Sequence, residues 1–292
     1  MYNFLLKVYA FLFGRRQFRR LNVLLFDLGT RGLGILNYQD RKISGESSFL
    51  RQYLRDRKSP VVLDVGANVG AYSQEVARVN PSAEVFAFEP HPRTFERLVS
   101  NLGTGKTFYL YNYALGAHPG YSTLYDRESG NGSSHASIFR EVIEDIHNAQ
   151  ARGYNVKVHT LDQFVEENQL ERIDLLKIDT EGYELNVLRG GVRTIGSGMV
   201  SAIQFEFNEM NVVSRAFFKD FWELLPQYRL YRMLPRGLLS IDCYNPLRCE
   251  LFAFQNIVAI RAEVLRGDVV EALLQRGDAV FHADHGADVG AR

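Results

Sequence analysis

The chain has 292 residues, enough for one large domain or two small ones with a substantial core. Lys plus Arg and Asp plus Glu number 34 each, so the net charge is zero, and outside the N-terminal segment there is no basic excess or stripe of the kind usual in nucleic-acid enzymes. We therefore expect no nucleic-acid partner, and two cysteines, too few for a disulfide framework, favour reduced thiols in the cytoplasm.

The first residues form an apolar segment next to a basic one. Residues 1–13 read MYNFLLKVYAFLF, and four arginines follow between positions 15 and 20. The apolar run is too short to span a bilayer, and its charge lies on the wrong side for a signal peptide. We favour an accessory helix packed on the main domain. The alternative is a helix in which residues 1–20 contact the inner face of a membrane.

Between this segment and the main domain, the pattern predicts two further pieces. Residues 26–43 are glycine-rich and weakly periodic, which is typical of loop and short strand. Residues 46–57 have apolar side chains at helical spacing, and the helix ends before Pro60. We thus expect an N-terminal helical extension over residues 1–58.

A strand, a glycine turn and a helix come next, in the sequence VVLDVGANVG of residues 61–70. The short apolar run predicts a buried parallel strand that ends near Asp64. Gly66 and Gly70 allow a tight turn and close approach to a ligand. The first N–H groups of the helix then point at whatever lies over the loop.

The spacing of this loop favours S-adenosylmethionine over a dinucleotide. The glycines read G-x-x-x-G, with Asn68 between them, whereas a dinucleotide loop reads G-x-G-x-x-G. The second strand, residues 84–88, leads into Glu89, where an acid would accept hydrogen bonds from ribose hydroxyls.

Strands and helices then alternate, which predicts an α/β fold with a mostly parallel sheet and helices on both faces. An insertion at about 117–160 interrupts the alternation, and long insertions of this kind are usually functional. We expect the main domain over residues 59–262, and a C-terminal helix with a frayed tail over 263–292. The seven predicted strands are residues 61–65, 84–88, 107–113, 174–179, 202–207, 228–234 and 251–260.

Four motifs in this order carry a family resemblance: DVGANVG from Asp64, FEP from Phe88, NYALG from Asn112, and LLKIDTEGYELNVLRGG from Leu175. Together they resemble the FkbM family of S-adenosylmethionine-dependent methyltransferases. The resemblance implies a Rossmann-like class I methyltransferase fold with an antiparallel final strand pair. It also implies O-methyl transfer to a hydroxyl of a sugar, glycan or similar polyol-like metabolite.

The residues at the carboxyl ends of the strands are the candidates for the site, because ligands of open parallel sheets bind there. For the cofactor, S-adenosylmethionine, they are Asp64, Gly66, Asn68, Gly70, Glu89, Asn112 and Ala114. Asp64 could equally be a structural acid that holds the N–H groups of the loop.

The catalytic candidates are Asp179, Glu181, Glu206 and His135. A hydroxyl acceptor needs a base, and these acids lie at the ends of two strands, while the histidine lies in a polar loop of the insertion. Asp179 and Glu206, with Asn208, could also hold Mg²⁺. Alternatively, the acids share a base role or a hydrogen-bond network.

Two other functions remain open from the sequence. One is a non-catalytic protein that binds S-adenosylmethionine or only retains the fold, although the intact loop glycines, Glu89 and Asp179 argue against decay. The other is an NAD-dependent oxidoreductase, which the glycine spacing disfavours.

Overall fold

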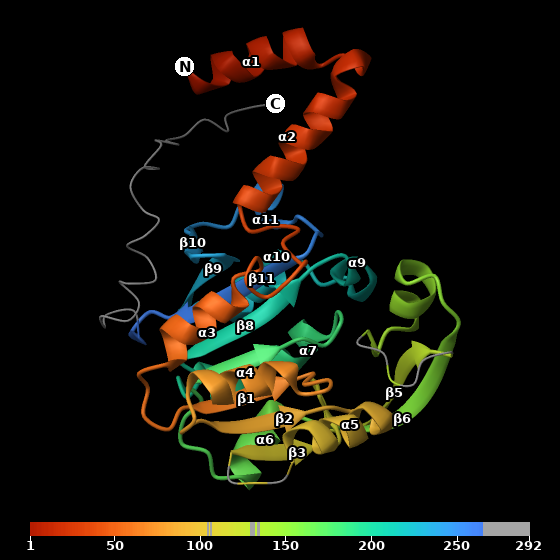
Figure 1. Cartoon of the computed structure of the whole chain (residues 1–292), viewed down its shortest axis with the longest axis vertical. Coiled ribbons are helices and arrows are strands. Elements are labelled where there is room, and N and C mark those ends of the chain that lie inside the picture. Colours follow the sequence, from red (N-terminus) through yellow and green to blue (C-terminus); the bar gives the residue numbers. More distant parts are fainter. Residues whose placement is uncertain (104, 106, 129–131, 133–134, 265–292) are drawn as a thin grey trace.

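An eight-stranded sheet runs through the centre of the computed structural model (Figure 1). The structure describes residues 1–103, 105, 107–128, 132 and 135–264. Across the sheet the strands are β10 (Gly237–Ile241), β9 (Tyr228–Leu234), β11 (Gln255–Arg261), β8 (Ala202–Phe207), β7 (Leu175–Ile178), β1 (Val61–Val65), β2 (Glu84–Phe88) and β3 (Phe108–Tyr111).

The sheet is parallel from β3 to β8 and antiparallel beyond. β1 pairs in parallel with β2 and β7, so the chain order reverses beside β1. β11 pairs antiparallel with both β8 and β9, as the family resemblance implies. The seven predicted strands are present, and β10 adds an eighth at the edge through a tight turn at Pro235 and Arg236.

Helices cover both faces of the sheet because alternate strand residues point to opposite faces. Val62 of β1 packs in one core with α3 and α4, and Leu63 packs in the other with α6, α7 and α10. The helices of the first face are α3 (Glu46–Leu54), α4 (Ala71–Val79) and α5 (Pro92–Leu102), and those of the second are α6 (Leu161–Glu167), α7 (Glu184–Arg189), α8 (Val192–Gly196), α10 (Phe218–Leu224) and α11 (Pro246–Cys249).

The N-terminal helices project away from this layered body (Figure 1). They are α1 (Tyr2–Phe13), the short η1 (Arg16–Phe18) and α2 (Arg19–Gly32). α1 buries no residue, so its expected packing on the main domain is wrong. The prediction of loop and short strand from residue 26 is also wrong as far as Gly32, because α2 continues to that glycine. None of the described helices is long and apolar enough to cross a membrane.

Two strands of the insertion, β5 (Gly120–Arg127) and β6 (Ala151–His159), form a small second sheet with β4 (Ala114–Leu115), which precedes the insertion; the order is β4, β6, β5. A π-helical turn, η2 (Val142–Ile146), connects its two long strands.

Two more observations bear on the predicted boundaries. α3, which we assigned to the N-terminal extension, contributes Phe49, Leu50 and Tyr53 to the core of the main domain. The boundary between extension and main domain at residue 58 therefore stays a prediction, because α3 precedes it in the sequence but packs in the core of the main domain. The structure describes the chain only as far as residue 264, so the predicted C-terminal helix and tail lie outside the described residues. The main domain also contains the short helix α9 (Met210–Ser214).

Candidate functional site

The glycine loop after β1 is built against neighbouring chain segments. Gly66 has a φ of +79°, and a Cβ there would lie 1.8 Å from the carbonyl oxygen of Asp179. Gly70 has a φ of +87°, and its Cβ would lie 2.8 Å from Leu98 and Leu102. Both positions favour glycine for conformation and for space. We expected these glycines to let a ligand approach the backbone closely. In the structure, the groups that approach them closely belong to the protein itself.

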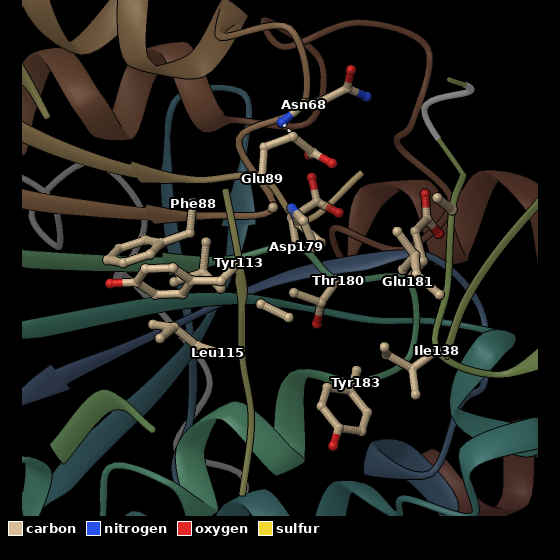
Figure 2. A pocket seen from close by; sticks show the side chains of 16 residues that line it. Asn68, Phe88, Glu89, Tyr113, Leu115, Ile138, Asp179, Thr180, Glu181 and Tyr183 are labelled. Atoms are coloured by element: carbon tan, nitrogen blue, oxygen red, sulfur yellow. Dashed lines mark hydrogen bonds between the residues drawn. The ribbon is translucent and has the colours of Figure 1, made fainter. Parts of the chain in front are cut away.

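A pocket that is partly open to solvent lies over this loop at the carboxyl ends of β1, β2 and β7 (Figure 2). Such a position beside the chain reversal is where open α/β sheets bind ligands. Its lining includes Gly66, Asn68, Phe88, Glu89, Tyr113, Ala114 and Leu115 from the sheet, Leu124, Ala136 and Ile138 from the insertion, and Asp179, Thr180, Glu181 and Tyr183 from the loop after β7.

Glu89 joins the glycine loop to the end of β2. Its side chain is 7% exposed, and its two oxygens accept hydrogen bonds from the backbone N–H groups of Asn68 (3.0 Å) and His91 (2.8 Å). Burial raises the pKa of Glu89 to about 7, although these two N–H groups oppose the rise. Each carboxylate oxygen retains a second lone pair for a ligand in the pocket.

The segment after β3 places three residues on the pocket wall and one outside it. Tyr113, Ala114 and Leu115 line the pocket. Asn112 is exposed and is absent from the lining; its amide donates to the carbonyl oxygens of Glu89 (2.8 Å) and Pro90 (3.2 Å). Asn112 therefore fixes the turn that carries Glu89.

Beneath the loop, Lys177 connects two acids. Its ammonium lies 3.3 Å from Asp64 Oδ1 and 3.1 Å from Asp179 Oδ2. Burial opposes the charge on Lys177, but the carboxylates of Asp179, Asp64 and Glu46 outweigh burial and raise its pKa. Asp64 is fully buried, also accepts from the Ser73 hydroxyl (2.7 Å), and is absent from the pocket lining.

Glu184 shapes the loop after β7. It is 1% exposed, and its Oε1 accepts from the backbone N–H groups of Thr180 (2.9 Å) and Gly182 (3.2 Å). Burial raises the pKa of Glu184 to about 7. This loop holds Glu181 at a φ of +54°, a left-handed conformation that is uncommon for residues other than glycine and clusters at functional sites.

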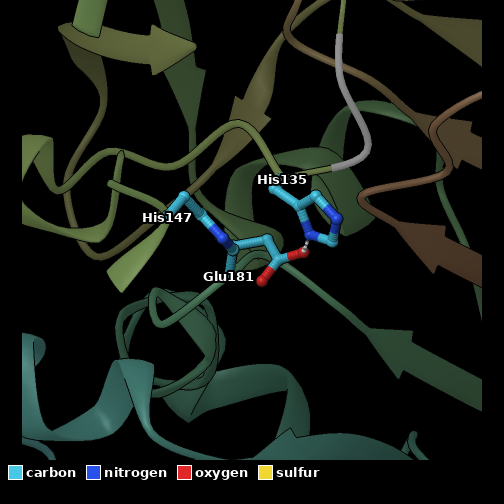
Figure 3. A group of neighbouring side chains, drawn as sticks. All are labelled: His135, His147 and Glu181. Carbon is cyan, nitrogen blue, oxygen red and sulfur yellow. Dashed lines mark hydrogen bonds and ion pairs between the residues drawn. The ribbon is translucent and has the colours of Figure 1, made fainter. Parts of the chain in front are cut away.

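Glu181 meets two histidines of the insertion (Figure 3). His135 Nδ1 lies 3.1 Å from Glu181 Oε1, and this hydrogen bond raises the pKa of His135. Burial raises the pKa of Glu181, with the contact to His135 opposing it. His147 offers a third atom, and one atom from each side chain fits within 4.8 Å of the others.

The insertion is fixed over the pocket by contacts on both sides of this cluster. The Ser137 hydroxyl donates to the backbone oxygen of Glu181 at 2.7 Å. On the other side, His91 Nε2 lies 3.6 Å from Asp126 Oδ2, and both side chains are fully buried.

Glu206 and Asn208 lie behind the pocket wall. The Asn208 amide donates to Glu206 at 3.2 Å, and its Oδ1 accepts from the Met210 N–H at 3.0 Å. Burial, followed by the charges of Asp179 and Glu181, raises the pKa of Glu206 well above its ordinary value. Neither residue is part of the pocket lining.

Comparison with known proteins settles the family. The family described as "Methyltransferase FkbM domain" matches residues 64–233, more than half of the chain. The chain belongs to this family. It is therefore an S-adenosylmethionine-dependent methyltransferase, and its main sheet with helices on both faces is the predicted class I methyltransferase fold.

Named relatives of this FkbM protein include two enzymes. The 2-O-methyltransferase NoeI of Sinorhizobium fredii is 26% identical over 194 residues, which cover 63% of this chain and 79% of NoeI. The hexuronic acid methyltransferase AglP of Haloferax volcanii is 30% identical over 161 residues, which cover 54% of this chain and 61% of AglP. Among solved structures, a precorrin-6y C5,15-methyltransferase from Geobacter metallireducens aligns at a TM-score of 0.40 with 12% identity, over 74% of this chain and 88% of that one.

The FkbM site thus brings together some of the predicted residues and leaves others aside. The pocket lining includes Gly66, Asn68, Glu89, Ala114, Asp179 and Glu181, whereas Asp64, Gly70, Asn112, Glu206 and Asn208 support it from outside. His135 reaches it through Glu181.

The predicted Mg²⁺ site of Asp179, Glu206 and Asn208 stays a prediction. Within the described part of the chain, His135, His147 and Glu181 are the histidine and carboxylate side chains close enough to share an ion. The sequence predicted the stretch from Asn112 to Ala114 at the cofactor, and Tyr113 within it lines the pocket. His147 was missed, because no sequence pattern pointed to it.

Proposed function

We propose that this FkbM protein transfers the methyl group of S-adenosylmethionine to a hydroxyl of a sugar, glycan or similar polyol. The observation that carries the proposal is the Glu181–His135 pair, which lies where the insertion meets the pocket. Further support comes from the relatives, because NoeI is named as a 2-O-methyltransferase and AglP as a hexuronic acid methyltransferase.

In this proposal the sheet side of the pocket holds the cofactor. The methionine part lies over Gly66 and Asn68, and the ribose hydroxyls donate to Glu89. The adenine lies between Phe88 and the stretch from Tyr113 to Leu115, which all line the pocket. Asp179 is also part of the lining, and its carboxylate supplies negative charge for the cationic donor.

The acceptor then lies on the side of the insertion. Its hydroxyl oxygen attacks the methyl carbon in line with the breaking carbon–sulfur bond, and S-adenosylhomocysteine leaves. The hydroxyl proton passes to the Glu181–His135 pair, which can accept one proton when Glu181 is ionised and His135 is neutral. Alignment of two partners can supply about 7–11 kcal/mol, and a positioned base about 10²–10⁴-fold in rate.

The test is release of S-adenosylhomocysteine with a panel of uronic acids, neutral sugars and oligosaccharides. With any acceptor that supports turnover, Glu181→Gln and His135→Gln should each lower kcat, for Glu181→Gln by about 10²-fold or more, with little change in cofactor affinity. Glu144→Gln is a matched control, because Glu144 lies in the same insertion but pairs with Arg140 at the surface. Wild-type turnover in both pair variants would refute the assignment of the base.

We also propose that residues 1–20 contact an anionic membrane surface. α1 exposes large apolar side chains such as Phe4 (68%) and Phe11 (77%). Lys7 and the four arginines accompany them, and no acidic residue precedes Asp27. This combination of apolar and basic side chains suits anionic lipids, and a second copy of the same basic segment would repel it.

A further inference from the structure

The cluster of His135, His147 and Glu181 contains one side chain more than proton transfer by the Glu181–His135 pair requires. Two of its members come from the insertion and the third from the loop after β7, so the cluster forms only when these parts are docked (Figure 3). One ligand atom from each residue fits within 4.8 Å of the other two. The rings of His135 and His147 lie 4.7 Å apart at their centres.

Glu181 and His147 are positioned by the surrounding structure. Glu181 is fixed by its left-handed backbone and by the Ser137 hydroxyl on its carbonyl oxygen. His147 directly follows η2, whose Val142 and Ile143 are fully buried, and π-helical turns occur frequently at functional sites. The Nε2 atom of His147 is buried and has no hydrogen-bond partner within the described residues.

We propose that His135, His147 and Glu181 bind a divalent first-row transition-metal ion such as Zn²⁺. Imidazole ligands suit these metals, whereas Mg²⁺ prefers oxygen ligands. Two histidines and one glutamate are a known three-ligand set that leaves an open position. Ligand atoms of a tetrahedral zinc site lie about 3.4 Å apart, given bonds of about 2.1 Å. His135 Nδ1 and Glu181 Oε1 lie 3.1 Å apart, close to this separation, and one atom of each of the three residues lies within 4.8 Å of the others.

The open position would face the acceptor, because Glu181 lines the pocket (Figure 2). This part of the inference rests on the proposed function. A metal held by these three residues would lower the pKa of an acceptor hydroxyl at its open position, so that the hydroxyl could lose its proton to solvent as its oxygen attacks the methyl carbon. The glutamate and histidine that would otherwise accept the proton would then hold the metal instead. No oxidant or reductant is required.

Metal binding can be tested without any acceptor. The full chain, freed of any histidine tag and treated with EDTA, is titrated with Zn²⁺ and separately with Mg²⁺ in a calorimeter. We expect one Zn²⁺ per chain and no comparable binding of Mg²⁺. His147→Ala should weaken Zn²⁺ binding at least about 100-fold, since even outer-shell changes cost 10–100-fold. His118→Ala is the matched control, because His118 is exposed and lies outside the cluster.

Absence of stoichiometric Zn²⁺ binding, or wild-type affinity in His147→Ala, would overturn the proposed site. Circular dichroism checks that each variant is folded. If His147→Ala is not folded, His135→Ala replaces it, because the His135 side chain is 42% exposed and tolerates truncation better.

Turnover with an active acceptor separates this inference from the proposed function. Full activity in EDTA, with loss in Glu181→Gln, would overturn the metal and leave the methyl transfer intact. Stoichiometric Zn²⁺ that depends on His147, without turnover on any hydroxyl acceptor, would support the metal site and count against the proposed acceptor.

Discussion

Lys177 is a buried cation that forms ion pairs with one carboxylate at the end of β1 and another at the end of β7. Its ammonium lies within 3.3 Å of Asp64 at the end of β1 and within 3.1 Å of Asp179 at the end of β7. Removing one partner of a buried ion pair leaves an uncompensated charge. Here the loss of Lys177 would leave the fully buried carboxylate of Asp64 without its cation, whereas Asp179 is 34% exposed at the pocket.

We therefore expect Lys177→Met to lower the free energy of unfolding by about 3–5 kcal/mol, as for other broken buried pairs. Urea unfolding followed by circular dichroism measures this change. Arg140→Met removes a cation from an exposed pair with Glu144 and should change stability little. Equal stability of Lys177→Met and the wild type would mean that the two acids are protonated or hydrated without the lysine.

If Glu89 accepts hydrogen bonds from the ribose, as we propose, cofactor binding should depend on pH. Because burial raises its pKa to about 7, Glu89 is protonated in the ligand-free protein below that pH. Ribose hydroxyls that donate to it favour the carboxylate, so binding releases a proton. The affinity for S-adenosylmethionine should then rise with pH up to about 7, by at most about tenfold per pH unit, and level off above.

Calorimetry in two buffers of different ionisation enthalpy measures this proton release at pH 6. Glu89→Gln should bind more weakly and lose the pH dependence between pH 5 and 7. A persistent dependence in Glu89→Gln would assign the titration to another group.

At the residue scale, position at a strand end predicted several pocket residues, although Glu206 and Asn208, selected in the same way, lie outside the lining. Glu89, Asp179 and Glu181 lie at or just beyond the ends of predicted strands, and the structure places all three on one pocket. His147 could not be found in this way, because its approach to Glu181 depends on how the insertion docks, which periodicity does not encode.

Among the elements, α1 and α2 depart most from expectation. The pattern of α1 fits a buried helix as well as a surface helix, and only the structure shows that it buries nothing. α2 was missed in part because Gly29 and Gly32 interrupt its pattern, yet glycine lowers helix stability by only about 1 kcal/mol. The strands were predictable because each is a short apolar run bounded by turn residues.

If residues 1–20 contact a membrane, the full chain should float with vesicles of anionic lipid and remain behind with zwitterionic ones. High salt should release it, since about 1 kcal/mol per basic residue is screened. A variant with glutamine at Arg15, Arg16, Arg19 and Arg20 should bind less and keep its melting temperature, because none of these residues is buried. Equal flotation of this variant, or dimerisation that depends on α1, would contradict the lipid contact.

For the whole molecule, cofactor binding should appear as thermal stabilisation. At a concentration of S-adenosylmethionine 100 times its Kd, binding stabilises the folded protein by about 2.7 kcal/mol. For a domain of this size the melting temperature should rise by about 5–10 °C. NAD at the same concentration should give no shift, and a larger shift with NAD would revive the oxidoreductase alternative.

The pocket is lined by two parts of the chain that lie apart in the sequence. Glu89 and the glycine loop belong to the sheet, whereas Leu124, Ala136 and Ile138 belong to the insertion. If the insertion carries the acceptor side, as we propose, substitutions in it should reshape that wall without moving the strands that bear Glu89 and the glycine loop. On this proposal a change of acceptor would require no new donor site, and exchange of residues 117–160 between relatives would alter the acceptor while S-adenosylmethionine binding is kept.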